Sequence, residues 1–156
     1  MSQDLSNLAN WAAPLLRGLS VDRRRAAMVQ VSTFLRRSQA ARIGAQRNAD
    51  GSPYEPRKAR TRLRDKKGAI RRKMFEKLRT AKYMRKAATA NSATITIGGR
   101  SARIARVHQY GLRDKVDWRL PKSPQVQYPR RELLGLTSAD EQAITDILLH
   151  HITAGT

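Results

Sequence analysis

The histidines His108, His150 and His151 are the residues of this chain best suited to metal binding or acid–base catalysis. A zinc site needs three or four ligands, and the sequence offers no cysteine and no further ligand at useful spacing from the His150–His151 pair. A catalytic histidine needs a nucleophile or a carboxylate partner, and spacing identifies none for His108. We therefore expect structural or solvated histidines, no bound metal and no cofactor.

The run Gly98-Gly99-Arg100-Ser101 could cradle a phosphate, because the first N–H groups of a helix point toward a bound anion. It lacks the lysine of a P-loop and the three-glycine spacing of a dinucleotide fingerprint, so a tight turn is favoured over an anion site. The carboxylates are few and scattered, and they form no acid–base pair. The sequence thus predicts that the protein is not an enzyme.

The charge balance is extreme: 32 Lys and Arg oppose 12 Asp and Glu in 156 residues, a formal net charge of +20. Such an excess favours contact with anionic partners or assembly neighbours. Half of the cations lie in residues 47–86, where they could follow a phosphate backbone with Tyr54 or Tyr83 stacking on bases. The alternative is a solvated surface that pairs with an acidic protein neighbour. No signature of base-specific recognition occurs, so any contact with DNA is expected to be non-specific.

Length and composition predict one domain over residues 1–156. Aromatic residues are only 5% of the chain, so the core must consist of aliphatic side chains. The amino terminus has no basic segment followed by an apolar run, and no window approaches 18 apolar residues. We therefore expect neither a secretory signal nor a membrane span, and a protein made in the cytoplasm.

Residues 93–111, ATITIGGRSARIARVHQYG, form the best-defined stretch. The alternation of Thr and Ile at its start predicts a strand, and the glycine pair predicts a sharp turn. Ile104, Val107 and Tyr110 recur every three residues, which predicts a short basic helix packed through this face and ended by Gly111.

Three further stretches have helical patterns. Residues 4–17 predict a helix that ends or kinks near Ala13, because Pro14 follows. A second helix is expected from near Val21 to Gly44, with the cations opposite one apolar stripe. That stripe consists of Met28, Val31, Phe34, Leu35 and Ile43. A third helix is expected over residues 69–88.

Residues 45–68 show no periodic pattern. The pair Asp50-Gly51 is a strong turn signal, Pro53 and Pro56 follow, and Tyr54 is the large apolar side chain between the two prolines. Unpatterned segments of this length are usually functional or order only on binding. The sequence therefore predicts a long basic loop or extended arm that orders on assembly.

The last third of the chain predicts a strand and a helix. Val126 and Tyr128 alternate with glutamines, and three nearby prolines favour an edge strand. Thr137 or Ser138 can cap the final helix, and Ser138 with Glu141 fits the capping-box spacing. The expected fold class is α+β, with helices packed on a small antiparallel sheet.

The chain is also polarised in charge. No Lys or Arg follows Arg131, whereas the final helix is acidic. A basic middle and an acidic end suit head-to-tail contact between copies, which closes into a ring when the rotation permits.

Three segments in order, RNADGSPYEPRK (47–58), IGGRSARIARVHQYG (97–111) and YPRRELLGLTSAD (128–140), resemble the phage virion morphogenesis family, the tail completion proteins of contractile-tailed phages. The resemblance covers about residues 29–151. It implies a structural virion protein that finishes the head-proximal end of the tail and enables head–tail joining. It also implies assembly in the host cytoplasm, contacts with other tail and neck proteins, and no catalytic residues.

By analogy with other tail rings, we expect a homo-oligomeric ring, a hexamer, with non-specific contact to DNA in its lumen. The alternative function is that of a stand-alone non-specific nucleic-acid-binding protein. The residues expected to contact subunits or DNA are Tyr54, Arg57, Arg100, Arg103, Arg106 and Tyr110. For Tyr110, a packed core tyrosine is the other interpretation.

Overall fold

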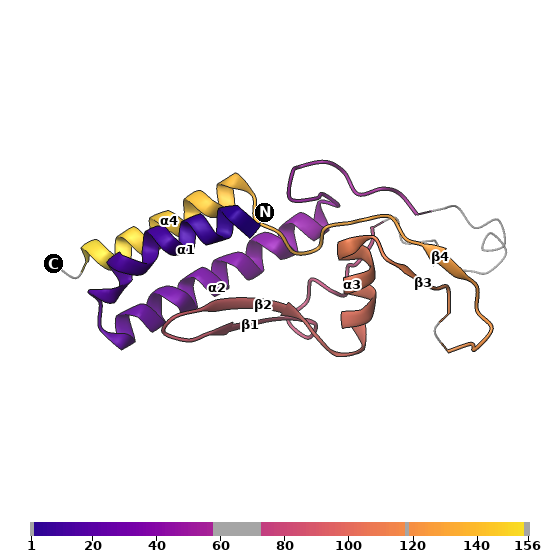
Figure 1. Ribbon diagram of the computed structural model, residues 1–156, viewed down its shortest axis with the longest axis horizontal. Helices are drawn as coiled ribbons and strands as arrows, with labels where there is room; N and C mark the ends of the chain where they lie inside the picture. Colours follow the sequence, from indigo (N-terminus) through magenta and orange to yellow (C-terminus); the bar gives the residue numbers. More distant parts are fainter. Residues whose placement is uncertain (1, 58–72, 118, 155–156) are drawn as a thin grey trace.

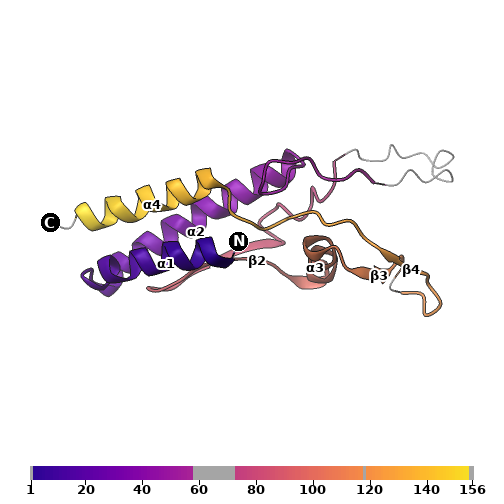
Figure 2. The same cartoon turned by 45° about the horizontal axis from the view of Figure 1, so that its top comes forward.

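The computed structural model describes residues 2–57, 73–117 and 119–154 of an elongated α+β molecule. Three helices lie together at one end: α1 (Ser2–Arg17), α2 (Val21–Gly44) and α4 (Ser138–Thr153) (Figure 1). A hairpin of β1 (Met84–Ala88) and β2 (Ala93–Ile97) packs on α2. The helix α3 (Ala102–Tyr110) and a second hairpin, β3 (Arg113–Lys115) with β4 (Gln125–Gln127), lie toward the other end (Figures 1 and 2).

Helix α2 belongs to both hydrophobic cores. The Ser20 hydroxyl caps it by accepting a hydrogen bond from the Arg23 N–H, and the helix ends at Gly44 as predicted. Around its carboxyl-terminal half lies one core, made of Ile43, Tyr54, Met74, Leu78, Met84, Ala105 and Leu133. Around its amino-terminal half lies the other, made of Ala12, Ala27, Met28, Val31, Ile144 and Leu148. The predicted apolar stripe of α2 is confirmed, and it connects the two cores.

Helix α1 does not end at Pro14, although an end or a kink near Ala13 was the expectation from sequence. It continues to Arg17 with Pro14 inside it. A proline in a helix interior removes one hydrogen bond and costs about 3 kcal/mol. The burial of Ala12 and the packing of Leu8 and Leu16 on the second core offset that cost.

The predicted third helix over residues 69–88 is wrong in the part that the structure describes. Residues 73–83 form turns, and Met84–Ala88 is a strand paired antiparallel with β2, Met84 opposite Ile97. Met84 is fully buried against α2, and the predicted strand at residues 93–97 needs a partner for its backbone groups. Pairing and burial therefore override local helix propensity.

The turn and helix after β2 are confirmed, but of the predicted inward face of the helix only Val107 is buried. Residues Gly99–Ser101 form a 3₁₀ turn, α3 follows, and Gly111 ends it in the left-handed conformation at φ 61°. Ile104 is 50% exposed and Tyr110 is 66% exposed. Ala105 packs in the core instead, because its small side chain lets the helix backbone approach the other elements.

The final third contains the predicted strand and helix. Strand β4 pairs antiparallel with β3, Asp114 opposite Val126. Helix α4 is capped by Thr137, and the capping box uses Asp140 rather than Glu141. The Asp140 carboxylate accepts a hydrogen bond from the Thr137 N–H at 3.0 Å, and the Thr137 hydroxyl accepts one from the Asp140 N–H at 3.1 Å.

Candidate functional site

Between β4 and α4 runs an irregular segment, residues 131–137, which we call the connector. Its first residues are buried, yet they belong to no sheet, so their backbone groups need other partners. Side chains supply acceptors for the N–H groups. Asn48 Oδ1 accepts from Glu132 at 2.8 Å, and Gln109 Oε1 accepts from both Leu133 and Leu134 at 2.9 Å.

The carbonyl groups of the connector are bonded in the same way. Arg42 donates to the Glu132 carbonyl at 2.8 Å, and the Tyr54 hydroxyl donates to the same oxygen at 2.9 Å. Gln109 Nε2 donates to the Leu134 carbonyl at 2.7 Å. Gln39 closes the set, because it donates to the Gly135 carbonyl at 2.8 Å and accepts from the Gly135 N–H at 3.1 Å. Side chains thus replace a neighbouring strand along the connector.

Arg131 joins the connector to two other segments. Its guanidinium donates to the carbonyl of Glu55 at 2.7 Å and to that of Pro56 at 3.1 Å, and lies 3.0 Å from Nδ1 of His108. Burial, followed by the charge of Arg131, lowers the pKa of His108 to about 4. His108 is therefore neutral near pH 7, and Nδ1 is the acceptor of the Arg131 hydrogen bond. Both the ring and the guanidinium have a structural role here.

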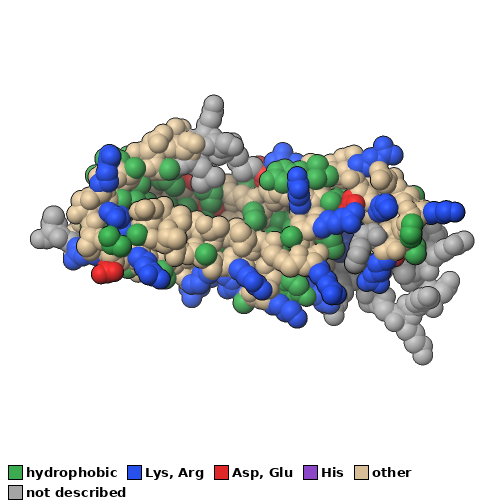
Figure 3. All heavy atoms as spheres, turned by 60° about the horizontal axis from the view of Figure 1, so that its bottom comes forward, with side chains coloured by type: hydrophobic (Ala, Val, Ile, Leu, Met, Phe, Trp, Pro, Cys, Tyr) green, Lys and Arg blue, Asp and Glu red, His purple; other side chains and the backbone are tan. Residues whose placement is uncertain are grey.

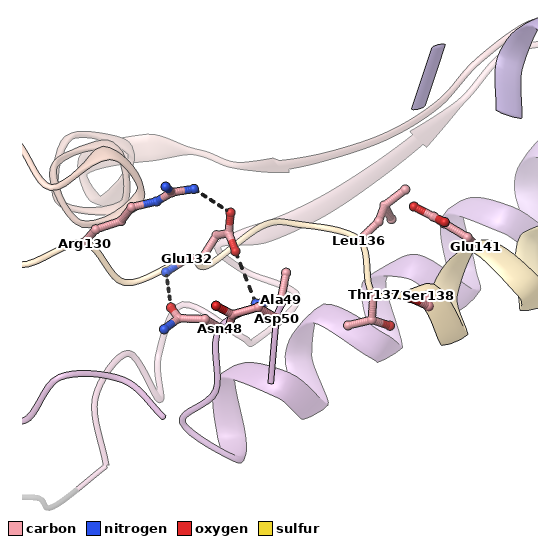
Figure 4. A pocket seen from close by; sticks show the side chains of 9 residues that line it. All are labelled: Asn48, Ala49, Asp50, Arg130, Glu132, Leu136, Thr137, Ser138 and Glu141. Carbon is pink, nitrogen blue, oxygen red and sulfur yellow. Dashed lines mark hydrogen bonds and ion pairs between the residues drawn. The ribbon is translucent and has the colours of Figure 1, made fainter. Parts of the chain in front are cut away.

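Close packing holds the connector against the turn after α2. Gly135 has no side chain, and a Cβ there would lie 2.9 Å from the Ala49 Cβ. Glu132 accepts a hydrogen bond from the Ala49 N–H at 3.2 Å and forms an ion pair with Arg130 at 2.9 Å (Figure 4). These groups line an open pocket of about 580 Å³ that continues to Thr137 at the start of α4. Four of its lining residues, Asn48, Ala49, Arg130 and Glu132, already bond one another.

The connector brings the three family-like segments into one place. Residues 47–57 contribute Asn48 and Tyr54, residues 97–111 contribute Gln109, and residues 128–140 contribute the connector itself. Their side chains bond backbone groups of the connector. The connector and the side chains that bond its backbone hold these parts of the fold together, and we call them the joint.

Sequence reasoning missed three polar residues of this joint: Gln39, Arg42 and Gln109. One signal could have found them. Gln39 lies four residues after Leu35 and four before Ile43, on the apolar stripe of α2, where a polar side chain must find a partner.

Tyr54 does not lie on a surface that a partner could reach. It is 4% exposed, and burial raises its pKa to about 12. Its expected role as a contact in the arm is therefore replaced by a role in the core. The other part of the arm, residues 58–72, lies outside the described residues.

The remaining predicted contact residues lie at the surface. Arg57 is exposed, and Arg100 is exposed in the 3₁₀ turn. Arg103, Arg106 and Tyr110 follow one another at spacings of three and four, so they share the outward face of α3. Arg103 forms a bidentate ion pair with Asp114, whereas Arg106 makes no ion pair among the described residues. Exposed cations also cover the face seen in Figure 3, where few acidic side chains are visible.

The described part of the chain holds neither a candidate metal site nor a candidate membrane span. It contains no group of three or more His, Cys, Asp or Glu side chains that could hold a metal ion. None of its helices combines the length and the apolar character that crossing a bilayer requires.

Comparisons with known proteins agree with the family resemblance of the three segments. The model of the phage virion morphogenesis family matches residues 3–153. The "Tail completion protein S" of Escherichia phage P2 is 38% identical over 139 residues, which cover 88% of this chain and 90% of that protein. No solved structure matches the chain. The family match spans nearly all of the sequence, and the chain therefore belongs to the phage virion morphogenesis family.

Proposed function

We propose that the protein is a structural component of a phage tail, which completes the head-proximal end of the tail and enables its joining to a head. The observation that supports this most is the 38% identity to a tail completion protein over 88% of the chain. The three segments that resemble the family meet in a bonded joint, which suits a protein whose task is to hold a shape within an assembly.

The same proposal includes a homo-oligomeric, six-fold ring around the DNA path, with tail and neck proteins as neighbours. The molecule is elongated, with α1 and α4 toward one end and the β3–β4 hairpin at the other (Figure 1), and unlike ends favour head-to-tail contacts. The net charge of +20 favours a location beside DNA or acidic neighbours. The location is the virion, after assembly in the host cytoplasm.

The proposal assigns no catalytic step to the protein. Among the described residues, the side chains of Tyr54 and His108 have strongly shifted pKa values, and both are engaged in hydrogen bonds, Tyr54 with the connector and His108 with Arg131. A general base needs an accessible nitrogen or oxygen beside a substrate. The pKa values of these two groups are shifted away from neutrality, which favours permanent structural roles.

Electron microscopy of particles made without this gene tests the proposal. Tails that are complete in tube and sheath but not attached to heads are the expected result. Supplying the gene from a plasmid should restore joined particles. Joined particles in the absence of the gene would refute the proposed function.

The second candidate is non-specific nucleic-acid binding by the free protein, favoured by the exposed cations Arg100 and Arg106. Its test is the affinity for short duplex DNA against salt concentration. If these cations contact phosphates, replacing both by alanine lowers the slope of log affinity against log salt by about 2. Arg103→Ala is the matched control, because Arg103 is already paired with Asp114. Absence of binding at low salt would exclude this candidate.

A further inference from the structure

Cationic side chains follow one side of helix α2 and the strand β1 that packs on it. Two hydrogen bonds align the helix with the strand. Lys86 Nζ donates to the Thr33 hydroxyl at 2.5 Å, and Arg36 Nε donates to the Met84 carbonyl at 3.1 Å. Thr33 and Arg36 lie three residues apart, so they share one side of α2. The strand therefore places its lysine beside the arginines of the helix.

The same side of α2 carries cations before and after these contacts. Arg25 precedes Arg36 by eleven residues, which is close to three helical turns, so the two arginines point to the same side. Arg37 is exposed and lies next to Arg36 in the chain. The guanidinium of Arg79 lies over the end of the helix, 3.3 Å from where a Cβ on Gly44 would be. We call this surface the α2–β1 ridge, and its cations are Arg25, Arg36, Arg37, Arg79 and Lys86.

Carboxylates are few along the α2–β1 ridge. Glu76 is paired with Arg79 at 2.9 Å, and Asp22 lies in the first turn of α2, where a negative charge favours the helix dipole. The other ridge cations make no ion pair among the described residues, namely Arg25, Arg36, Arg37 and Lys86. Figure 3 shows Lys and Arg side chains one after another along the lower edge of that view. The ridge therefore has a net positive charge.

Two of these cations are held in place and still have donors to offer. Arg36 uses its Nε and Lys86 uses one N–H in the contacts between helix and strand. Their other N–H groups have no partner among the described residues, and both side chains reach the surface. Donors that are already oriented lose little conformational freedom when they bind an anion.

The length and composition of the ridge fit a nucleic-acid backbone better than a protein surface. From Arg25 to Gly44 the helix spans about 28 Å, and duplex DNA carries a phosphate about every 3.4 Å along each strand, so the ridge matches about eight base pairs. Protein interfaces instead have an apolar, aromatic-rich centre and are depleted of lysine. Over this length of α2 the exposed large apolar side chain is Val29 alone.

We propose that the α2–β1 ridge binds the phosphate backbone of duplex DNA. The inference rests on the proposed ring around the DNA path, and it specifies which surface of each copy faces the DNA. Contacts to phosphates position a protein on the duplex without reading its bases. The ridge therefore binds duplexes of unrelated sequence with similar affinity.

The salt dependence of DNA affinity tests the ridge. The ridge variant combines Arg25→Gln, Arg37→Gln and Lys86→Gln, which remove three cations that make no ion pair among the described residues. Its affinity for a short labelled duplex is measured by fluorescence anisotropy between about 50 and 200 mM salt. The slope of log affinity against log salt should fall by about 3 relative to wild type, and the affinity at about 100 mM salt should fall at least tenfold.

The matched control removes the same charge elsewhere. It combines Arg17→Gln, Arg113→Gln and Lys122→Gln, at exposed cations of α1 and of the β3–β4 hairpin and its connection. Its slope and affinity should stay close to those of wild type. Equal losses for the two variants would show that binding follows total charge, and wild-type affinity of the ridge variant would show that the ridge does not bind DNA. Either result overturns the proposal.

Two further measurements complete the test. Circular dichroism and thermal unfolding show whether the variants fold, and Arg37→Gln alone, at an exposed side chain, should lower the slope by about 1 if the triple variant does not fold. An unchanged slope for Arg37→Gln would then refute the ridge. Absence of DNA binding by the wild-type protein at about 50 mM salt would refute it in favour of an acidic protein partner.

The failure of this inference differs from the failure of the proposed function. If the ridge does not bind DNA but deletion of the gene leaves tails unattached to heads, the ridge is refuted and the tail function stands. If particles are joined without the gene, the tail function itself fails, whatever the ridge binds.

Discussion

Gln109 gives the sharpest test of the joint. Its side chain accepts hydrogen bonds from the Leu133 and Leu134 N–H groups at 2.9 Å and donates to the Leu134 carbonyl at 2.7 Å. Gln109→Met keeps the length of the side chain and removes all three hydrogen bonds. Two backbone donors and one backbone acceptor of the connector then lose their partner.

The cost follows from the burial of these groups. A buried polar group left without a partner costs about 1–3 kcal/mol. Leu133 is fully buried, whereas Leu134 is only partly buried, so water can reach part of its backbone. We therefore expect Gln109→Met to lower the free energy of unfolding by about 3 kcal/mol. For a chain of this size that corresponds to a fall of roughly 6–12 °C in Tm.

Equilibrium unfolding in urea, followed by far-ultraviolet circular dichroism at two protein concentrations, measures this change and detects any contribution from assembly. Gln142→Met is the control, because Gln142 is exposed and its side chain bonds Asp146 within the same helix. That variant should stay within about 0.5 kcal/mol of wild type. A loss of less than about 1 kcal/mol for Gln109→Met would refute the claim that this side chain replaces a strand partner of the connector.

Three further predictions concern single residues. Folding lowers the pKa of His108 to about 4, so as the pH falls the unfolded chain takes up a proton at this residue before the folded protein does. The free energy of unfolding that depends on neutral His108 is therefore complete above pH 6.5 and is lost between about pH 6.5 and 4. Unfolding that is independent of pH in this window would contradict it. Thr137→Ala should lower the free energy of unfolding by about 1 kcal/mol in the same urea assay, because the Asp140 N–H loses the hydroxyl that caps it. An unchanged free energy of unfolding would contradict a stabilising role of the capping box. Gly111→Ala should lower Tm more than Gly51→Ala. Both glycines have positive φ, but of the two only Gly111 would place a Cβ against backbone, 3.1 Å from the Arg130 nitrogen. Equal falls in Tm for the two variants would contradict this prediction.

The sequence alone predicted the elements whose signals are local. Helix α2, the β2 strand, the turn that follows and the end of α3 at Gly111 all agree with their patterns. The predicted 69–88 helix was wrong over residues 73–88, because the evidence for it was local as well. The strand there exists only through pairing with β2 and through the burial of Met84.

The predicted contact residues also differ in how well the sequence placed them. The exposure of Arg100, Arg106 and Tyr110 agrees with a surface role, although their partners are a matter for experiment. Tyr54 was misplaced because a turn-rich sequence around an aromatic residue does not reveal where its ring goes. In the fold its hydroxyl reaches the carbonyl of Glu132, which lies 78 residues later in the chain.

What the sequence by itself determined is the fold class, the cationic excess and the family, since composition, periodicity and ordered segments are properties of the chain alone. Only the tertiary structure decided what the three segments are for. It placed Asn48, Tyr54 and Gln109 against one connector, because buried backbone groups that lack a strand must bond whatever polar side chains the fold brings to them.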